Sequence, residues 1–287
     1  MKWKLGLAAW LGVLFVTQPA LAAESFELQQ LEQRLAASAR ENPGDFGMAA
    51  MDLTTGETIG VNSHQAFPMA STMKIAVAAA YLAEVDAGRR SLYDYVGSST
   101  AYDLMDRMMV RSDNGATDQL IATLGGPQAI DYWLRTHGLT GIRVDRTIAQ
   151  LLAARRDLWD VRDSSTPVAM LELLRLVDGD KALTPQSRGL LLDMMGRCAT
   201  GKNRIRGLLP SYAVQNKTGT LNNFSTDVGF LTLPDGRRVA VAFFARGGEN
   251  RPAVIATAAR AIYDGFGTRT AMADSGQGGR VLMQAVR

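Results

Sequence analysis

Ser71 and Lys74 are the first residues of this sequence whose types and spacing suggest chemistry. They stand three residues apart at the head of the stretch PMASTMKIAVAAA, a spacing that places both side chains on one face of a helix. Residues 75–83 are rich in alanine and apolar on every side, which predicts a buried helix. Burial and the positive end of the helix dipole both lower the pKa of a lysine at this position. A neutral lysine is a usable base, so the pair could activate the serine hydroxyl.

A purely structural interpretation is that Ser71 or Thr72 caps the helix while Lys74 extends toward water. Two later motifs bear on the choice: S-D-N at 112–114 and K-T-G-T at 217–220. Alone, the first is typical of a helix N-terminus or an Asx turn, and the second of a turn that leaves a strand. In the order S-x-x-K, S-D-N, K-T-G, however, the three form a known set in which a serine nucleophile accepts an acyl group from the substrate.

The elements that position these motifs follow from the hydrophobic periodicity. Residues 24–41 predict an amphipathic helix, and residues 45–62 predict a β-hairpin that turns at 54–56. From 71 to about 209 the pattern is mostly helical. Strands return at 212–221, 227–233 and 238–245, the last two joined through the turn at 234–236, and a final helix is predicted over 252–266.

Strands at both ends of a helical middle predict an α+β fold. We expect one antiparallel sheet flanked by the N- and C-terminal helices, with an all-helical second part beside it. The predicted catalytic domain is single and covers 23–266, with a sheet part at 23–66 and 211–266 and a helical part at 67–210. A flexible tail is predicted over 267–287. The cleft between the two parts is the expected place for a site.

The ends of the chain and its composition limit the partners. Residues 1–22 resemble a secretory signal, with Lys2 and Lys4, an apolar core and an A-x-A cleavage pattern; an uncleaved N-terminal anchor is the alternative. Without them the chain holds 29 basic and 28 acidic residues, so we expect no nucleic-acid partner. Cys198 is the single cysteine and His64 and His137 are the only histidines, so we expect no internal disulfide, no metal site and no cofactor.

Longer segments extend the motif set into a resemblance. The stretches FPMASTMK, LAEVDAG, RSDNGATDQLIATLGGP, RDSSTPVAM and KTGT, with the pair Asp145-Arg146, resemble the class A serine β-lactamases over most of residues 25–266. The resemblance implies the β-lactamase/transpeptidase-like fold. It also implies hydrolysis of β-lactams through an acyl-enzyme on a serine.

The resemblance assigns the catalytic roles. Ser71 would be the nucleophile that accepts the acyl group, Lys74 would take or tune its proton, and Ser112 would pass a proton to the departing ring nitrogen. The backbone N–H groups of Ser71 and Thr220 would form the oxyanion hole.

The resemblance also assigns the substrate-binding residues. Asn114 would hydrogen-bond the amide side chain of the substrate, and Lys217, Thr218 and Thr220 would hold its carboxylate. The arginine that usually binds this carboxylate from the late strands is missing, with Thr226 near its position. We expect Arg251 to replace it, although a solvated residue at a helix end is the alternative. The segment 88–112 is shorter than in the family, so one wall of the cleft should be more open.

The loop after Asp145-Arg146 departs from the family in the residues that release the product. Family members carry a glutamate that activates the hydrolytic water and an asparagine beside it, but here Ile148 and Leu152 stand at those positions. A positioned general base contributes roughly 10²–10⁴-fold, so deacylation should be slow or rearranged. Asp157 and Asp160 lie inside the loop and could turn inward, although solvation at the surface is the favoured interpretation. Arg146 and Asp163 are expected to pair and close the loop.

Three hypotheses follow from these residues. The first is a β-lactamase with a rearranged hydrolytic step, and the second is a penicillin-binding protein, peptidase or esterase with a long-lived acyl-enzyme. The third is a non-catalytic binding module, which the intact acylation residues disfavour. In each case we expect a small β-lactam or D-Ala-type peptide ligand. We also expect a periplasmic or secreted monomer, without stable membrane insertion after the signal is cleaved.

Overall fold

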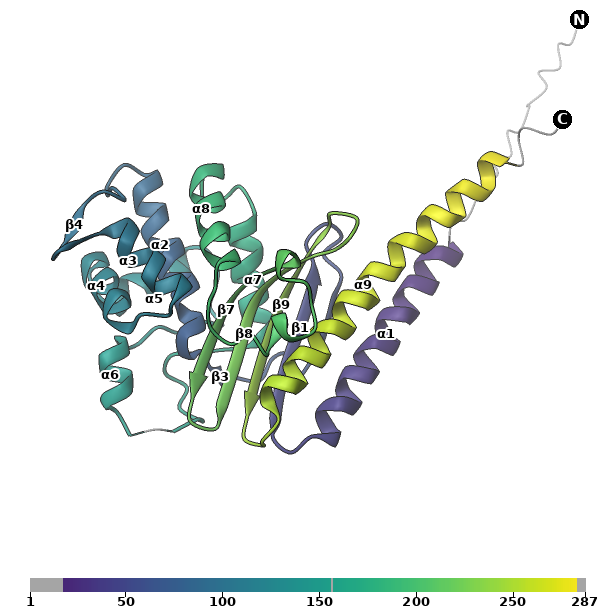
Figure 1. Cartoon of the computed structure of the whole chain (residues 1–287), viewed down its shortest axis with the longest axis horizontal. Helices are drawn as coiled ribbons and strands as arrows, with labels where there is room; N and C mark the ends of the chain where they lie inside the picture. Colours follow the sequence, from purple (N-terminus) through teal and green to yellow (C-terminus); the bar gives the residue numbers. More distant parts are fainter. Residues whose placement is uncertain (1–17, 156, 283–287) are drawn as a thin grey trace, which may run out of the picture.

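An antiparallel sheet of five strands runs through the centre of the protein, in the order β2-β1-β9-β8-β7 (Figure 1). The computed structural model describes residues 18–155 and 157–282, with side chains described between 26 and 267. The hairpin of β1 and β2 belongs to the N-terminal part of the chain, and β9 pairs with β1 to join it to the late strands. The strands are β1 (Asp45–Asp52), β2 (Thr58–Val61), β7 (Val214–Leu221), β8 (Phe224–Thr232) and β9 (Arg238–Arg246).

Alternate residues of the strands pack into two different cores, one on each face of the sheet. In β1, Met48 and Ala50 belong to one core and Ala49 and Met51 to the other. This alternation is the period of two that a pleated strand imposes. Because helices cover both faces, the strands are apolar on both sides and almost wholly buried.

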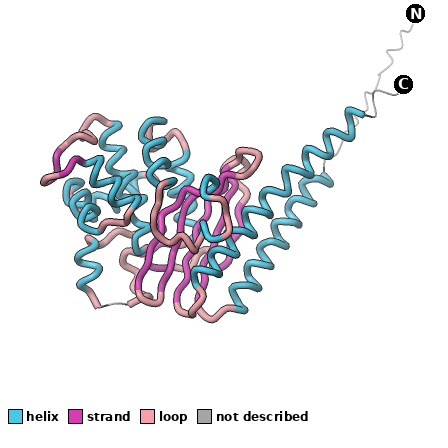
Figure 2. The backbone as a smooth tube through the Cα atoms, viewed as in Figure 1, coloured by secondary structure: helices cyan, strands magenta, loops and turns pink. Residues whose placement is uncertain are grey.

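The two terminal helices cover one face. These are α1 (Gln18–Glu41) and α9 (Arg251–Leu282), which lie side by side and project beyond the sheet (Figures 1 and 2). Leu28, Leu31 and Leu35 repeat at helical spacing on α1 and are buried against the sheet and α9. Among the described residues, no helix combines the length and apolar character that a bilayer crossing requires.

The helical part lies beside the other face, where α7 packs directly on β1 and β9. Helix α2 runs through this part and is apolar on every side, with residues from Lys74 to Leu82 buried. Its helices are α2 (Lys74–Asp86), α3 (Ala101–Val110), α4 (Asn114–Leu124), α5 (Pro127–Thr136), α6 (Ile148–Ala153), α7 (Pro167–Asp178) and α8 (Pro185–Gly196). Shorter elements are η1 (Ala70–Met73), η2 (Ile205–Gly207), η3 (Ser211–Ala213), and the strand pairs β3 (Phe67–Pro68) with β6 (Ser164–Ser165) and β4 (Tyr95–Val96) with β5 (Ser99–Thr100).

The predicted α+β architecture, with a sheet between terminal helices and a helical part, is confirmed. Several element bounds differ from the sequence prediction: α1 begins at Gln18 rather than at 24, β7 at Val214 rather than at 212, and β8 at Phe224 rather than at 227. Two further differences concern the site and the end of the chain. Ser71 lies in the 3₁₀ turn η1, and the α-helix begins only at Lys74. The last helix runs on to Leu282 rather than ending at Phe266, since no proline follows Pro252 to stop it. The predicted signal peptide lies mainly outside the described residues, and the flexibility of 267–287 stays a prediction.

Candidate active site

Ser71 lies where the short strand β3 passes into the turn η1. Its neighbours Met69, Thr72 and Met73 are fully buried, whereas Ser71 itself is partly exposed. Thr72 Oγ1 donates to the carbonyl of Met69 at 2.7 Å and so fixes the turn. Ala70 adopts a left-handed conformation, with φ of 47°, which costs energy in a residue with a Cβ. The chain therefore presents one accessible hydroxyl from a rigid and locally strained turn.

Lys74 is completely buried, and its ammonium contacts the S-D-N motif. Nζ donates to the carbonyl of Ser112 at 2.8 Å, to Asn114 Oδ1 at 2.8 Å and to Ser112 Oγ at 3.1 Å. Burial, followed by the nearby charge of Lys217, lowers the pKa of Lys74 to about 7. No hydrogen bond joins Lys74 to Ser71 in the described part of the chain. Catalytic hydrogen bonds are often long or poorly aligned before substrate binds, so this absence does not argue against Lys74 as the base.

The S-D-N motif forms the turn that begins α4. Ser112 has a φ of 60° and so is a second non-glycine residue in the left-handed region at this site. Asp113 Oδ1 accepts the N–H of Ala116 at 2.8 Å, which makes Asp113 the N-cap of the helix. Asp113 therefore has the structural role predicted for this motif, that of a residue at a helix N-terminus. The two neighbouring side chains, Ser112 and Asn114, are the ones that meet Lys74.

Strand β7 brings the K-T-G-T motif against Ser71. A Cβ on Gly219 would lie 2.9 Å from the backbone nitrogen of Ser71, so only glycine allows this close approach. Lys217 is fully buried, its Nζ donates to the carbonyl of Thr218 at 2.9 Å, and burial lowers its pKa to about 8. Thr218 Oγ1 is hydrogen-bonded to Thr200 Oγ1, which fixes the hydroxyl from behind the strand.

Arg204 is the arginine that reaches the K-T-G-T strand. Its guanidinium donates to the carbonyls of Gly219 at 2.7 Å and Thr226 at 2.9 Å, and to Thr220 Oγ1 at 2.6 Å. It is 6% exposed, and in the described residues its Nε and Thr226 Oγ1 are buried without a partner. Unsatisfied buried polar groups are costly, and among the described residues Arg251 Nε is another of them, so the contacts with β7 are what distinguish Arg204. Arg251, the arginine expected from the sequence, instead donates to loop carbonyls at the start of its own helix.

Arg204 is not among the site residues predicted from the sequence. Position 204 lies in an irregular segment between α8 and β7, before the short turn η2, and only the fold places it under the late strands. Sequence spacing alone gave no signal that this segment returns to the site.

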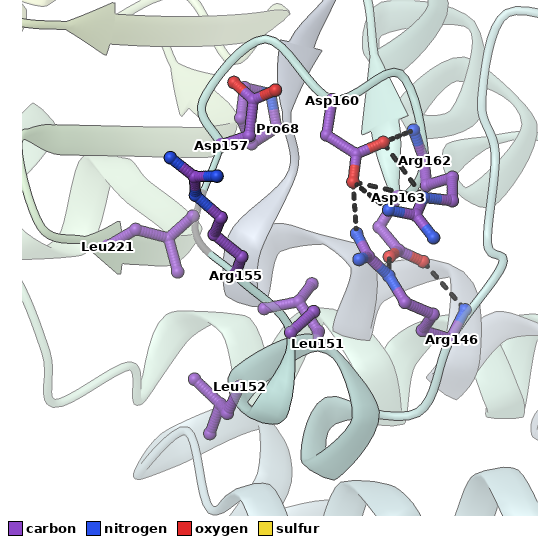
Figure 3. A pocket seen from close by; sticks show the side chains of 11 residues that line it. Pro68, Arg146, Leu151, Leu152, Arg155, Asp157, Asp160, Arg162, Asp163 and Leu221 are labelled. Atoms are coloured by element: carbon purple, nitrogen blue, oxygen red, sulfur yellow. Dashed lines mark hydrogen bonds and ion pairs between the residues drawn. The ribbon is translucent and has the colours of Figure 1, made fainter.

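The loop between Asp145 and Asp163 is closed as predicted. Arg146 Nε donates to Asp163 Oδ2 at 2.6 Å, and the N–H of Arg146 donates to Asp163 Oδ1 at 3.0 Å (Figure 3). The same Oδ1 accepts the N–H of Asp145 at 2.8 Å. Asp163 is 1% exposed, so this carboxylate has exchanged water for three protein donors. The expectation of an Arg146–Asp163 pair is confirmed.

Apolar side chains occupy the loop positions of the missing glutamate and asparagine. Ile148 is the first residue of α6 and is 5% exposed within the core of the helical part, while Leu152 is exposed one turn later. A cavity of about 120 Å³ lies between this loop and the end of β7 (Figure 3). Its lining includes Pro68, Leu151, Leu152, Ala154, Arg155, Asp157 and Leu221.

The two loop carboxylates named from the sequence are engaged within the loop. Asp160 pairs with Arg162 at 2.8 Å and with Arg146 at 3.3 Å, and hydrogen bonds from Arg162 lower its pKa to about 2 (Figure 3). Asp157 is exposed, and its Oδ1 accepts the N–H of Trp159 at 2.8 Å. Among the described residues, the hydrogen-bond and ion-pair partners of both carboxylates belong to the loop itself, which agrees with solvation and local pairing, although Asp157 also lines the cavity beside Pro68.

Comparisons with known proteins agree with this geometry. Residues 30–266 match the family described as the Beta-lactamase enzyme family. A carbapenem-hydrolyzing beta-lactamase KPC from Klebsiella oxytoca is 31% identical over 250 residues, which cover 78% of this chain and 85% of that protein. The chain belongs to the class A serine β-lactamase family. Within this family, the beta-lactamase CTX-M-25 of Escherichia coli is 30% identical over 88% of this chain and 94% of its own.

Solved β-lactamase structures share the fold. The crystal structure of a beta lactamase from Xanthomonas campestris has a TM-score of 0.77 and 28% identity, and the match covers 85% of this chain and 98% of that one. An ancestral class A beta-lactamase of Gram-negative bacteria has a TM-score of 0.76 and 32% identity, over 82% and 99% of the two chains. The resemblance that the motifs suggested is therefore confirmed for the family and for the fold.

Proposed function

We propose that this protein is a class A-type serine β-lactamase that opens the lactam amide through an acyl-enzyme on Ser71 and releases the product slowly. The contact of buried Lys74 with Ser112 and Asn114, beside the accessible Ser71, is the observation that carries this proposal. A pKa of about 7 leaves much of Lys74 neutral at physiological pH, as a base must be.

Acylation follows from these contacts. Ser71 Oγ attacks the lactam carbonyl carbon, and its proton passes to the neutral amine of Lys74. When the carbon–nitrogen bond breaks, the ring nitrogen takes a proton from Ser112, which Lys74 replenishes through their 3.1 Å hydrogen bond. The N–H groups of Ser71 and Thr220 are the proposed oxyanion hole, since β7 lies directly against the Ser71 backbone.

Arg204 and Lys217 are the proposed partners of the substrate carboxylate. Lys217 is buried within the K-T-G-T strand and Arg204 is buried against it, so a bound anion would neutralise charge that water does not reach. Thr220 is already oriented by Arg204, and Thr218 by Thr200, so the hydroxyls are held before substrate arrives. Asn114 remains the proposed partner of the substrate's amide side chain.

Deacylation is the step that we expect to be slow. Ile148 offers no proton acceptor for the hydrolytic water, and Leu152 offers no hydrogen bond to hold it. The same apolar substitutions favour a second candidate function, a penicillin-binding protein, peptidase or esterase that acts on a D-Ala-type peptide or related acyl donor. Such an enzyme would keep acylation and hold the acyl group on Ser71 for a long time before water or another nucleophile removes it.

A chromogenic β-lactam tests both candidates. Purified protein is mixed with excess substrate, and the burst, the steady state and the intact mass are followed together. Sustained turnover after a burst supports the β-lactamase, and a stoichiometric adduct without turnover supports the second candidate. Absence of both, with Ser71→Ala indistinguishable from the wild type, would reject acyl transfer altogether.

We also infer that the mature chain begins at Ala23 and is a periplasmic or secreted monomer. The charged start, apolar core and A-x-A pattern of the leader support the export signal. N-terminal mass analysis of the fractionated protein tests the cleavage, and light scattering of the purified protein tests the monomer. A mass that retains Lys2 and Lys4 in the membrane fraction would favour the uncleaved anchor instead.

A further inference from the structure

Arg246 is the last residue of β9 and joins the sheet to the loop between Asp145 and Asp163. Its Nε donates to Asp45 Oδ2 at 3.1 Å, and its Nη2 also pairs with this carboxylate on the neighbouring strand β1. Its Nη1 donates to the carbonyl of Leu158, in the loop, at 2.8 Å. Arg246 is only 4% exposed, so these protein acceptors replace the water that a guanidinium would otherwise bind.

Trp159 covers the same guanidinium from the loop. The Cζ atom of Arg246 lies 3.2 Å from the centroid of the Trp159 ring, which is a cation–π contact. Arginine favours such stacking because its guanidinium is planar and weakly hydrated. Trp159 is nevertheless 69% exposed, so the stack with Arg246, rather than burial in a core, holds this ring in place.

The guanidinium also contacts the strand that leads to the nucleophile. Its Cζ atom lies 4.9 Å from the ring centroid of Phe67 in β3. Phe67 in turn stacks on Phe244 of β9, with ring centroids 5.6 Å apart. Ser71 follows four residues after Phe67, in the turn η1. Arg246 therefore links the loop and the strand before Ser71 through one side chain.

Both contacts lie next to walls of the cavity of about 120 Å³ between the loop and β7 (Figure 3). Pro68, directly after Phe67, lines this cavity from β3. Asp157 and Asp160 stand on either side of the two loop residues that Arg246 contacts, and they line the cavity from the loop. Residues 157–162 form no helix or strand, so the position of this wall depends on tertiary contacts.

The cavity adjoins the residues proposed for acylation. Pro68 lies three residues before Ser71, and Leu221, which lines the cavity from β7, directly follows Thr220. An acyl group on Ser71 would therefore carry its side chain past this opening.

We propose that Arg246 and Trp159 are positioning residues that together set the distance between the loop and β3, and so the shape of the cavity beside Ser71. We assign neither residue a part in bond making or bond breaking. The kinetic consequence rests on the proposed function, because the shape of the cavity affects a rate only if Ser71 takes an acyl group.

Hydrogen exchange followed by mass spectrometry tests the positioning without any substrate. Trp159→Leu removes the stacked ring, so the amides of 157–162 should exchange faster by roughly fivefold, a factor typical of one lost cation–π contact, while those of 64–69 stay unchanged. Arg246→Lys keeps a positive charge beside Asp45 but loses the planar stacking group, so exchange should rise in both segments.

Tyr132→Leu is the matched control. Tyr132 is an aromatic residue of α5 that is 71% exposed and lies outside the lining of the cavity, so its loss should leave exchange of 157–162 unchanged. Equal exchange of this segment in Trp159→Leu and wild type, or the same acceleration in Tyr132→Leu, would overturn the positioning role.

Two substrates test the kinetic part. A penicillin with an aromatic acyl side chain and the penicillin nucleus with a free amine in its place share the ring and the carboxylate. We expect Trp159→Leu to lower the rate constant of adduct formation by roughly fivefold for the first substrate and to leave the second unchanged. Trp159→Phe, which keeps a ring for the guanidinium, should restore the wild-type rate.

Equal rates in Trp159→Leu and wild type, or equal losses with both substrates, would contradict the link between this stack and the cavity. So would a loss in Trp159→Phe as large as that in Trp159→Leu. Absence of an acyl adduct in the wild type would instead reject the proposed function, and the exchange measurements would still decide the positioning role.

Discussion

The change Ile148→Glu should convert a slow deacylation into a faster one. Ile148 occupies the first turn of α6, where a carboxylate is favoured by the helix dipole, and the family carries its water-activating glutamate at this loop position. A positioned general base is worth roughly 10²–10⁴-fold in rate. In barrier height this corresponds to about 2.7–5.5 kcal/mol.

The structure places the expected gain at the lower end of that range. The carboxylate of Asp118 already accepts the N–H of Ile148 at 2.6 Å, so a second negative charge at this position would be repelled. Ile148 is 5% exposed, and its loss from the core should cost about 2–5 kcal/mol of stability. The favourable interaction of the new carboxylate with the helix dipole of α6 would offset only about 0.3–1 kcal/mol of this loss. We therefore expect roughly 10²-fold faster deacylation in a protein that is less stable.

The assay distinguishes the effect of an added general base on deacylation from the effect of lost core packing. Rapid mixing with a chromogenic cephalosporin gives the burst and the steady state, and intact mass gives the lifetime of the adduct. Ile148→Gln is the matched control, because it has the same length as glutamate and the same loss of apolar burial without a proton acceptor. Equal adduct lifetimes in the glutamate and glutamine variants would refute the reasoning, as would fast wild-type turnover with Ile148 in place.

Three further predictions address the rest of the site. Lys74→Met should lower the burst rate by roughly 10²–10⁴-fold, and the wild-type burst should rise with pH through about 7, because only the neutral amine accepts a proton; a flat profile would argue against this base. Arg204→Ala should lower kcat/KM for an anionic β-lactam by an amount that corresponds to a loss of about 1.5–3 kcal/mol in transition-state stabilisation, whereas Arg251→Ala should change kcat/KM little. A larger effect of Arg251→Ala would indicate that Arg251 binds the carboxylate instead. Asp163→Asn should cost about 3–5 kcal/mol in urea unfolding since it breaks a buried pair, and Asp160→Asn about 1 kcal/mol or less; similar losses would contradict the burial argument.

Much of the fold could be predicted because its elements are encoded locally. The apolar residues of β1 and β9 alternate between two cores, and a strand that carries this pattern needs helices on both faces. The burial of helix α2 could be predicted because its sequence has no polar face. The start of this helix was less predictable, since 3₁₀ and α turns have similar sequence preferences and only the fold sets Ser71 in η1.

The site could be predicted where motif residues contact one another and not where the fold supplies the partner. Lys74, Ser112 and Asn114 come from two motifs, and the structure joins them by hydrogen bonds. Arg204 belongs to no motif. It reaches the site only because the segment before β7 folds back against the late strands. An isolated arginine in a sequence carries no local signal of such a long-range contact.

The ratio of acylation rate to deacylation rate at Ser71 tests the central claim most directly. Quenched-flow mixing with a β-lactam, followed by intact and peptide mass analysis, measures both rates on the same residue. We predict one adduct per molecule, located on Ser71, that forms at least about 10²-fold faster than it decays. An adduct at another residue, or steady hydrolysis that persists in Ser71→Ala, would contradict the account.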